Sequence, residues 1–289
     1  MINLTELLQP SGKGGTWIGA PGPAVSPRLF GGQAVAQGLL AAAGEEAAGR
    51  LANSVHAHFL MAGMAEEPVE YRVTSLSEGR SFATRRVDAF QGDLLIFTMV
   101  AAFHAPEAGF RHQEEARLPL DLEEAQAGLE AWRTAHSEDL SNPLVKRLQN
   151  RPIDIVPLDP DAVFGRNTRR SITGSWMRVR NPGEAEPAMQ RALLAYASDM
   201  LFLRNALLPH GVTPGSAEVQ AASLDHAIWF HETPNFFDWH LYITESPWAA
   251  HARGLNRGQF YAQDGTLVAS VTQESLMRPR GASLERLAS

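Results

Sequence analysis

The sequence predicts an α+β fold built from two similar units, and two observations lead to this prediction. A run that is apolar on nearly every side, residues 34–43, is followed by strand-like segments rich in β-branched and aromatic residues. A second helix-like run, residues 186–208, is followed by strand-like segments in the same order. A buried helix followed by antiparallel strands describes a sheet wrapped around a helix, the hot-dog unit, so we expect a double hot-dog fold.

The first unit is expected to begin with a short amphipathic helix at residues 3–8 and a strand at residues 17–21. Leu29-Phe30-Gly31-Gly32-Gln33 then opens the buried helix. Strands are expected at residues 54–60, 69–76, 80–91 and 94–104, and Gln91-Gly92-Asp93 is typical of a hairpin turn between the last two.

The second unit is expected to repeat this order. Its strand candidates are residues 176–179, 221–231, 239–245, 249–261 and 266–277, with Asp264-Gly265 as the last hairpin turn. His56 corresponds to His226, Tyr71 to Leu241 at the same separation, and Arg85 to Arg253 after a small shift. Because these matches keep their order, they indicate an internal duplication.

The chain therefore divides into an N-terminal unit at residues 1–110, a linker at residues 111–170, and a C-terminal unit at residues 171–289 that carries the catalytic candidates. The linker is acidic and then proline-rich. We expect surface helices at residues 118–136 and 143–149, with Pro152, Pro157 and Pro160 ending regular structure.

Composition excludes several classes of protein. The formal net charge of −7 argues against a nucleic-acid binder, which needs a basic face. The absence of cysteine removes disulfides, thiolate metal sites and a cysteine nucleophile, and it suits a reducing compartment such as the cytoplasm. The longest apolar stretches, residues 94–103 and 192–203, are shorter than the roughly 20 residues of a membrane span, so we expect a soluble protein without membrane contact.

Asp199 is an unusual residue for its surroundings, because its helical neighbours Ala195, Phe202 and Leu203 are all apolar. Burial would raise the pKa of its carboxyl group towards that of a useful general base. A structural role, as a helix kink or a hydrogen bond to a strand, is the alternative.

Gln273 and Ser223 are the other polar candidates. Strand alternation places Gln273 on the inward face with Ala269 and Val271, where a structural amide is the simpler interpretation. Ser223 is expected on the same face as Asp225, and by itself indicates an edge or capping hydroxyl.

The sequence closely resembles the acyl-CoA thioesterase II family, also called TesB-type, over residues 1–115 and 170–280. The stretches that carry the resemblance are Leu29-Phe30-Gly31-Gly32-Gln33, Ser81-Phe82-Ala83-Thr84-Arg85-Arg86-Val87, Phe103-His104-Ala105-Pro106-Glu107-Ala108-Gly109-Phe110, Tyr196-Ala197-Ser198-Asp199, Leu208-Pro209-His210-Gly211, Ala222-Ser223-Leu224-Asp225-His226-Ala227-Ile228-Trp229-Phe230-His231, Ser246-Pro247-Trp248-Ala249 and Gln263-Asp264-Gly265-Thr266-Leu267-Val268-Ala269-Ser270. The resemblance implies a double hot-dog fold, hydrolysis of fatty acyl-CoA to fatty acid and CoA, and no cofactor or metal. It also implies a homodimer or homotetramer.

The family's catalytic aspartate, hydroxyl residue and glutamine fall on Asp199, Ser223 and Gln273. We expect Asp199 to take a proton from a water that Ser223 and Gln273 hold. The backbone amides of Gly31 and Gly32 are candidates to stabilise the oxyanion.

The substrate's phosphates call for arginines, for which Arg85, Arg86 and Arg253 are the main candidates, with Arg257 and Arg278 as further ones. Solvated surface charge is the alternative interpretation of each.

Three other functions are weighed against hydrolysis. A hot-dog enoyl-CoA hydratase or dehydratase would use His226 with Asp225, and a non-catalytic module would only bind acyl-CoA. His56 and His58 could lie on one strand face as metal ligands, but no third ligand is evident.

Overall fold

The computed structural model describes residues 3–23, 26–46, 48–136, 151–164, 172–181, 183–212 and 217–281. The elements of the N-terminal half are α1 (Leu4–Leu8), β1 (Ser11–Lys13), β2 (Thr16–Gly19), α2 (Gly31–Gly44), β3 (Leu51–Phe59), β4 (Val69–Glu78), β5 (Phe82–Gln91) and β6 (Leu94–His104). Those of the rest of the described chain are α3 (Leu122–Ala135), β7 (Ile153–Pro157), α5 (Pro160–Phe164), β8 (Ile172–Val179), α6 (Pro187–Ser198), α7 (Arg204–Leu207), the 3-10 helix η2 (Leu208–His210), β9 (Val219–Ser223), β10 (Asp225–Phe230), β11 (His240–Ala250), β12 (Arg253–Ala262) and β13 (Leu267–Pro279).

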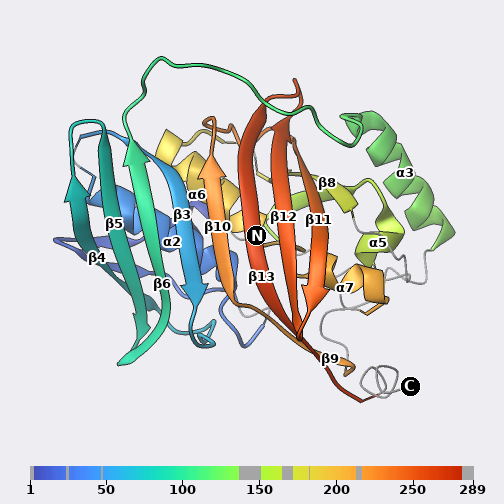
Figure 1. Ribbon diagram of the computed structural model, residues 1–289, viewed down its shortest axis with the longest axis horizontal. Coiled ribbons are helices and arrows are strands. Elements are labelled where there is room, and N and C mark those ends of the chain that lie inside the picture. The colour runs from blue at the N-terminus through green and yellow to red at the C-terminus, as the bar shows by residue number, and fades with distance from the viewer. Residues whose placement is uncertain are drawn as a thin grey trace.

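One antiparallel sheet runs through both halves. Its strand order is β1-β2-β4-β5-β6-β3-β10-β13-β12-β11-β8-β7, with β9 paired to β13. In Figure 1 the strands from β4 to β11 face the viewer, and α2 and α6 lie behind them. Each half thus has a central helix against an antiparallel sheet, which confirms the predicted double hot-dog fold.

The two halves meet where β3 pairs with β10. Ala57 lies opposite His226 and His56 opposite Ala227. The histidines that match in sequence therefore point to opposite faces of the sheet, with His226 buried and His56 exposed. Behind the junction α2 packs against α6. The order β5-β6-β3 in one half mirrors β12-β13-β10 in the other, as the predicted duplication requires.

α2 is buried because small apolar residues cover nearly all of its sides. A Cβ on Gly38 would lie 3.2 Å from Met99 Cε, so this glycine permits close packing against β6. The buried amide of Gln37 donates to the carbonyl oxygens of Leu7 and Ala20 and accepts from the Tyr71 hydroxyl. The helix therefore carries a buried polar group whose hydrogen-bonding capacity is used.

The predicted helix at residues 186–208 is wrong in its length. α6 ends at Ser198, whose carbonyl oxygen accepts a hydrogen bond of 2.8 Å from the Tyr242 hydroxyl. Leu201 then takes a left-handed conformation with φ of 64°, which stops regular helix until α7 begins. The long apolar pattern hid this break because both segments are buried.

Three strand predictions also need correction. The expected strand at residues 221–231 is divided into β9 and β10 by Leu224. Between the expected strands 239–245 and 249–261 there is no turn at Pro247, because β11 passes through a bulge there and turns only at His251 and Ala252. In the predicted linker, β7 adds an unpredicted strand beside β8.

The linker helix predicted at residues 118–136 is confirmed as α3. The helix predicted at residues 143–149 lies outside the described residues. Pro157 ends β7 as expected, whereas Pro160 begins α5. Within the described ranges, no helix has the length and apolar character that crossing a membrane would need.

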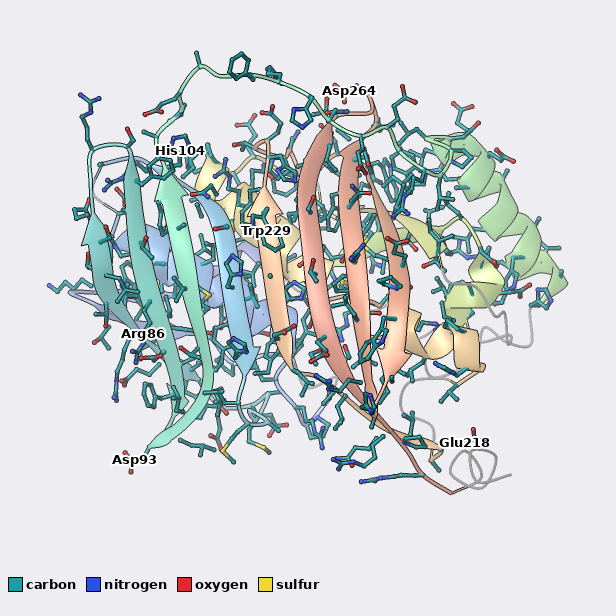
Figure 2. All side chains as sticks on the ribbon, in the orientation of Figure 1. Arg86, Asp93, His104, Glu218, Trp229 and Asp264 are labelled. Atoms are coloured by element: carbon teal, nitrogen blue, oxygen red, sulfur yellow. The ribbon has the colours of Figure 1, made fainter. Side chains whose placement is uncertain are left out.

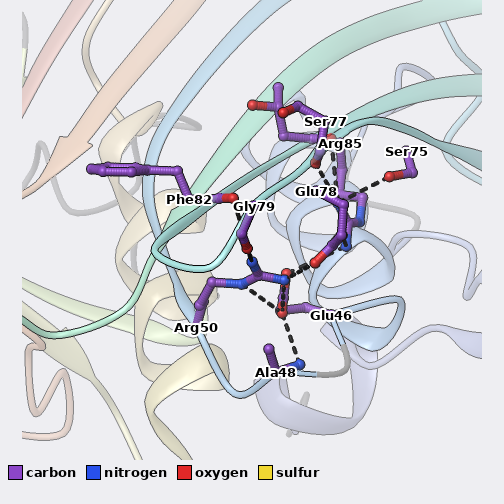
Figure 3. Close-up of polar contacts among 10 residues, drawn as sticks. Glu46, Ala48, Arg50, Ser75, Ser77, Glu78, Gly79, Phe82 and Arg85 are labelled. Atoms are coloured by element: carbon purple, nitrogen blue, oxygen red, sulfur yellow. Dashed lines mark hydrogen bonds and ion pairs between the residues drawn. The ribbon is translucent and has the colours of Figure 1, made fainter.

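A cluster of four charged side chains joins the loop after α2 to the hairpin between β4 and β5 (Figure 3). Glu46 and Glu78 each bind both Arg50 and Arg85. Arg50, Arg85 and Glu46 have almost no exposed surface, so the pairing offsets the cost of their burial.

Candidate active site

Asp199 lies where the end of α6 meets the beginning of α2. Its Oδ2 accepts a hydrogen bond of 2.9 Å from the backbone amide of Gly32. A Cβ on Gly31 would lie 2.8 Å from this oxygen, and one on Gly32 would lie 2.4 Å from the carbonyl oxygen of Tyr196. The two glycines therefore let the helices approach closely enough for the carboxylate to bind the first turn of α2.

The environment of Asp199 favours its protonated form. Burial raises the pKa of its carboxyl group to about 7, and this effect outweighs the opposing influence of the Gly32 amide and the Arg151 guanidinium. Arg151 lies 4.6 Å from the ring centroid of Phe30 and donates to the Tyr196 hydroxyl at 3.4 Å. A carboxyl group with this pKa can both take and release a proton near neutral pH.

Asp199 forms part of the wall of a cavity of about 350 Å³. Most of the lining is apolar, with Phe59 and Ile96 from the N-terminal half and Ala221 and Ala222 from the C-terminal half. Among the described residues of the lining, the side chains with a charge or a hydroxyl are Arg28, Asp199 and Ser223. The cavity thus presents one carboxylate and one hydroxyl to an apolar space between the two halves.

Ser223 reaches this cavity through an irregularity in its strand. The Leu224 amide donates to Glu274 O, and Ser223 lies opposite Ser275 in the pairing of β9 with β13. Leu224 is thus an extra residue between β9 and β10, and it shifts the alternation of side chains by one. Ser223 and Asp225 therefore lie on opposite faces, and the prediction that they share one is wrong. The Ser223 hydroxyl lies on the inward face, 2.9 Å from Gln273 Nε2.

Gln273 is fully buried, as its place in the alternation predicted. It does not line the cavity but lies behind Ser223. Its Oε1 is 2.7 Å from His226 Nδ1, and His226 Nε2 is 2.8 Å from Ser198 Oγ. A continuous polar chain therefore runs from Ser223 through Gln273 and His226 to the residue that precedes Asp199.

His226 is neutral within this chain. Its Nε2 lies 2.8 Å from Ser198 Oγ, which donates its one proton to the carbonyl oxygen of Ala195 at 2.8 Å. Burial lowers the pKa of His226 to about 4, so the ring is neutral at pH 7. Neither the burial of His226 nor its partners were predicted from the sequence.

The arginines predicted to bind phosphate lie elsewhere. Arg85 is buried in the ionic cluster of Figure 3. Arg86 is on the surface (Figure 2) and pairs with Asp88. Arg253 pairs with Glu274 and lies over the ring of Trp248. None of the three lines the cavity, whereas Arg28, which was not predicted from the sequence, does.

The histidines proposed as a metal pair do not gather other ligands. The ring of His56 contacts the ring of Trp229, with centroids 5.1 Å apart, on the exposed face of the sheet (Figure 2). In the part of the chain that the structure describes, no group of three His, Cys, Asp or Glu side chains could hold a metal ion.

Comparison with known proteins gives consistent results. A family model described as acyl-CoA thioesterase matches residues 162–276, and one described as the acyl-CoA thioesterase N-terminal domain matches residues 20–104. Acyl-CoA thioesterase 2 of Haemophilus influenzae is 34% identical over 254 residues, which cover 87% of this chain and 88% of that protein. Human acyl-coenzyme A thioesterase 8 is 35% identical over 260 residues, covering 87% and 81% respectively.

Among solved structures, a tesB protein of Mycobacterium avium subs paratuberculosis superimposes with a TM-score of 0.77 at 26% identity. The superposition covers 94% of this chain and 97% of that one. The likeness thus extends over both hot-dog units and the junction where the cavity lies. On this evidence, the chain belongs to the acyl-CoA thioesterase family.

Proposed function

We propose that the protein hydrolyses fatty acyl-CoA to free fatty acid and CoA, with Asp199 as the general base. The names of its relatives support this substrate class. The single observation that carries the assignment to Asp199 is a carboxyl group with a pKa of about 7 in the wall of an apolar cavity. Such a group suits the activation of water next to an acyl chain.

In the proposed reaction, the ionised carboxylate of Asp199 takes a proton from water as the oxygen attacks the thioester carbonyl carbon. The carbonyl electrons move to its oxygen, and when they return the bond between carbon and sulfur breaks. The CoA sulfur leaves as a thiolate, which needs little acid help because thiols have a pKa of about 8.5. The proton on Asp199 then passes to the thiolate or to solvent, which restores the base.

Ser223 and Gln273 have different parts in this proposal. Because Gln273 Nε2 donates to Ser223 Oγ, the hydroxyl proton of Ser223 is available to a partner in the cavity. Ser223 therefore orients the attacking water through a hydrogen bond. Gln273 is a positioning residue that acts through Ser223 rather than on the water itself.

The N-terminus of α2 is the proposed site of oxyanion stabilisation. The Gly32 amide is already bonded to Asp199. Gly31 lines the cavity, and its amide belongs to the first turn, where amides have no acceptor within the helix. Of the two candidates, the Gly31 amide is thus the better placed to donate to developing negative charge.

The geometry does not favour the hydratase alternative. His226 has no exposed surface, and both ring nitrogens are engaged within the core. Asp225 Oδ1 accepts from the Glu274 amide. The described residues that line the cavity include no histidine.

The compartment and the assembly belong to the same proposal. The lack of cysteine supports the cytoplasm, because no residue depends on an oxidising environment. A homodimer or homotetramer is proposed from the resemblance to the family.

Asp199→Asn should lower kcat for medium- and long-chain acyl-CoA by about 10²- to 10⁴-fold, because an amide cannot take the proton. Its oxygen can still accept the Gly32 hydrogen bond, so KM should change little. Steady-state assays measure both, with Asp93→Asn at an exposed hairpin turn as the matched control. A folded Asp199→Asn protein with near-normal turnover would end the assignment.

The same variant should be more stable than the natural protein at pH 8. The pKa of Asp199 is about 7 in the folded protein but about 3.9 in an unfolded chain, so the folded state holds more protons between these values. The stability of the natural protein therefore falls as the pH rises from about 4 to about 7. We expect Asp199→Asn to raise Tm by roughly 3–10 °C at pH 8, a gain that shrinks towards pH 4.

Thermal denaturation across this pH range measures the gain, with Asp93→Asn again as the control. A gain that does not depend on pH, or a variant less stable at pH 8, would contradict the raised pKa.

A further inference from the structure

The mouth of the cavity combines exposed apolar side chains with one cation. Leu60 and Met61 line the cavity, and about half of each side chain is exposed, as is Met64 beside them. Arg28 is the one cation among the described lining residues, and it is exposed to solvent. A surface of this kind suits a ligand that has both an apolar body and an anionic group.

Arg28 differs from the arginines considered from sequence in its electrostatic partners. Arg85, Arg86 and Arg253 each bind a carboxylate. No described acidic side chain lies within ion-pair distance of Arg28. Its guanidinium therefore keeps all its donors for a ligand.

The backbone around Arg28 is fixed at the rim. Arg28 forms a bridge with Met64, the Leu29 amide donates to Gly63 O at 2.8 Å, and the Ala65 amide donates to Pro27 O at 3.1 Å. The Arg28 amide also donates to Ser26 Oγ at 3.2 Å. Because the backbone is held, ligand binding has only the side chain to order.

We infer that Arg28 binds a phosphate group of the CoA part of the substrate, an inference that rests on the proposed function. The chain as a whole is negative and would repel a polyanion. A guanidinium at the mouth offsets this repulsion and can bind two phosphate oxygens at once. The phosphates stay outside, while the thioester reaches Asp199 at the cavity wall.

The experiment compares two substrates with the same acyl chain. One is the acyl-CoA, and the other is the N-acetylcysteamine thioester, which keeps the thioester but has no phosphate. Arg28→Gln should raise KM for acyl-CoA about 5- to 20-fold, with kcat nearly unchanged. The kcat/KM for the N-acetylcysteamine thioester should stay within about twofold. Arg72→Gln, at an exposed arginine paired with Glu70, is the matched control.

The other possible results contradict either the assignment of Arg28 to phosphate or the proposed function. Equal losses with both substrates, or no loss with either, would overturn the phosphate assignment. A rise in KM with Arg86→Gln or Arg253→Gln instead would return the phosphate site to the residues expected from sequence. If the natural protein hydrolysed neither thioester, the proposed function would fail, and calorimetric titration of Arg28→Gln and natural protein with CoA would decide the inference by itself.

Discussion

The hydrogen bond between the Gly32 amide and Asp199 links the two halves at their functional centre. It requires the C-terminus of α6 to point at the N-terminus of α2, and the pairing of β3 with β10 sets the two units in that relation. The positive end of the α2 dipole stabilises the carboxylate and lowers its pKa, but removal of the carboxylate from water raises the pKa by more. The resulting pKa of about 7 depends on this balance, so neither unit could produce the site by itself.

The core around this contact is arranged to hold polar groups in one orientation. The Tyr242 hydroxyl donates to Ser198 O, in place of the backbone amide that would do so in a continuing helix. α6 ends at Ser198, one residue before Asp199. From the Ser198 side chain, hydrogen bonds lead through His226 and Gln273 to Ser223 in the cavity wall. Each of these buried groups has a hydrogen-bond partner, so the chain adds rigidity at the centre of the site.

Much of this arrangement follows from local patterns in the sequence. The apolar neighbours of Asp199 and the alternation around Gln273 indicated their burial correctly. The face of Ser223 was not predictable, because the bulge at Leu224 arises from how β9 pairs with β13. The arginines predicted to bind phosphate do not line the cavity, whereas Arg28 owes its position there to a bridge with Met64, a tertiary contact without a sequence pattern.

The raised pKa of Asp199 is the central claim, and the pH dependence of catalysis tests it most directly. The substrate should be an N-acetylcysteamine thioester, because it has no ionisable group of its own in this range. We expect kcat/KM to be level above about pH 7 and to fall about tenfold for each pH unit below it, as the base becomes protonated. A kcat/KM that stays constant down to pH 5 in the folded protein would contradict the account.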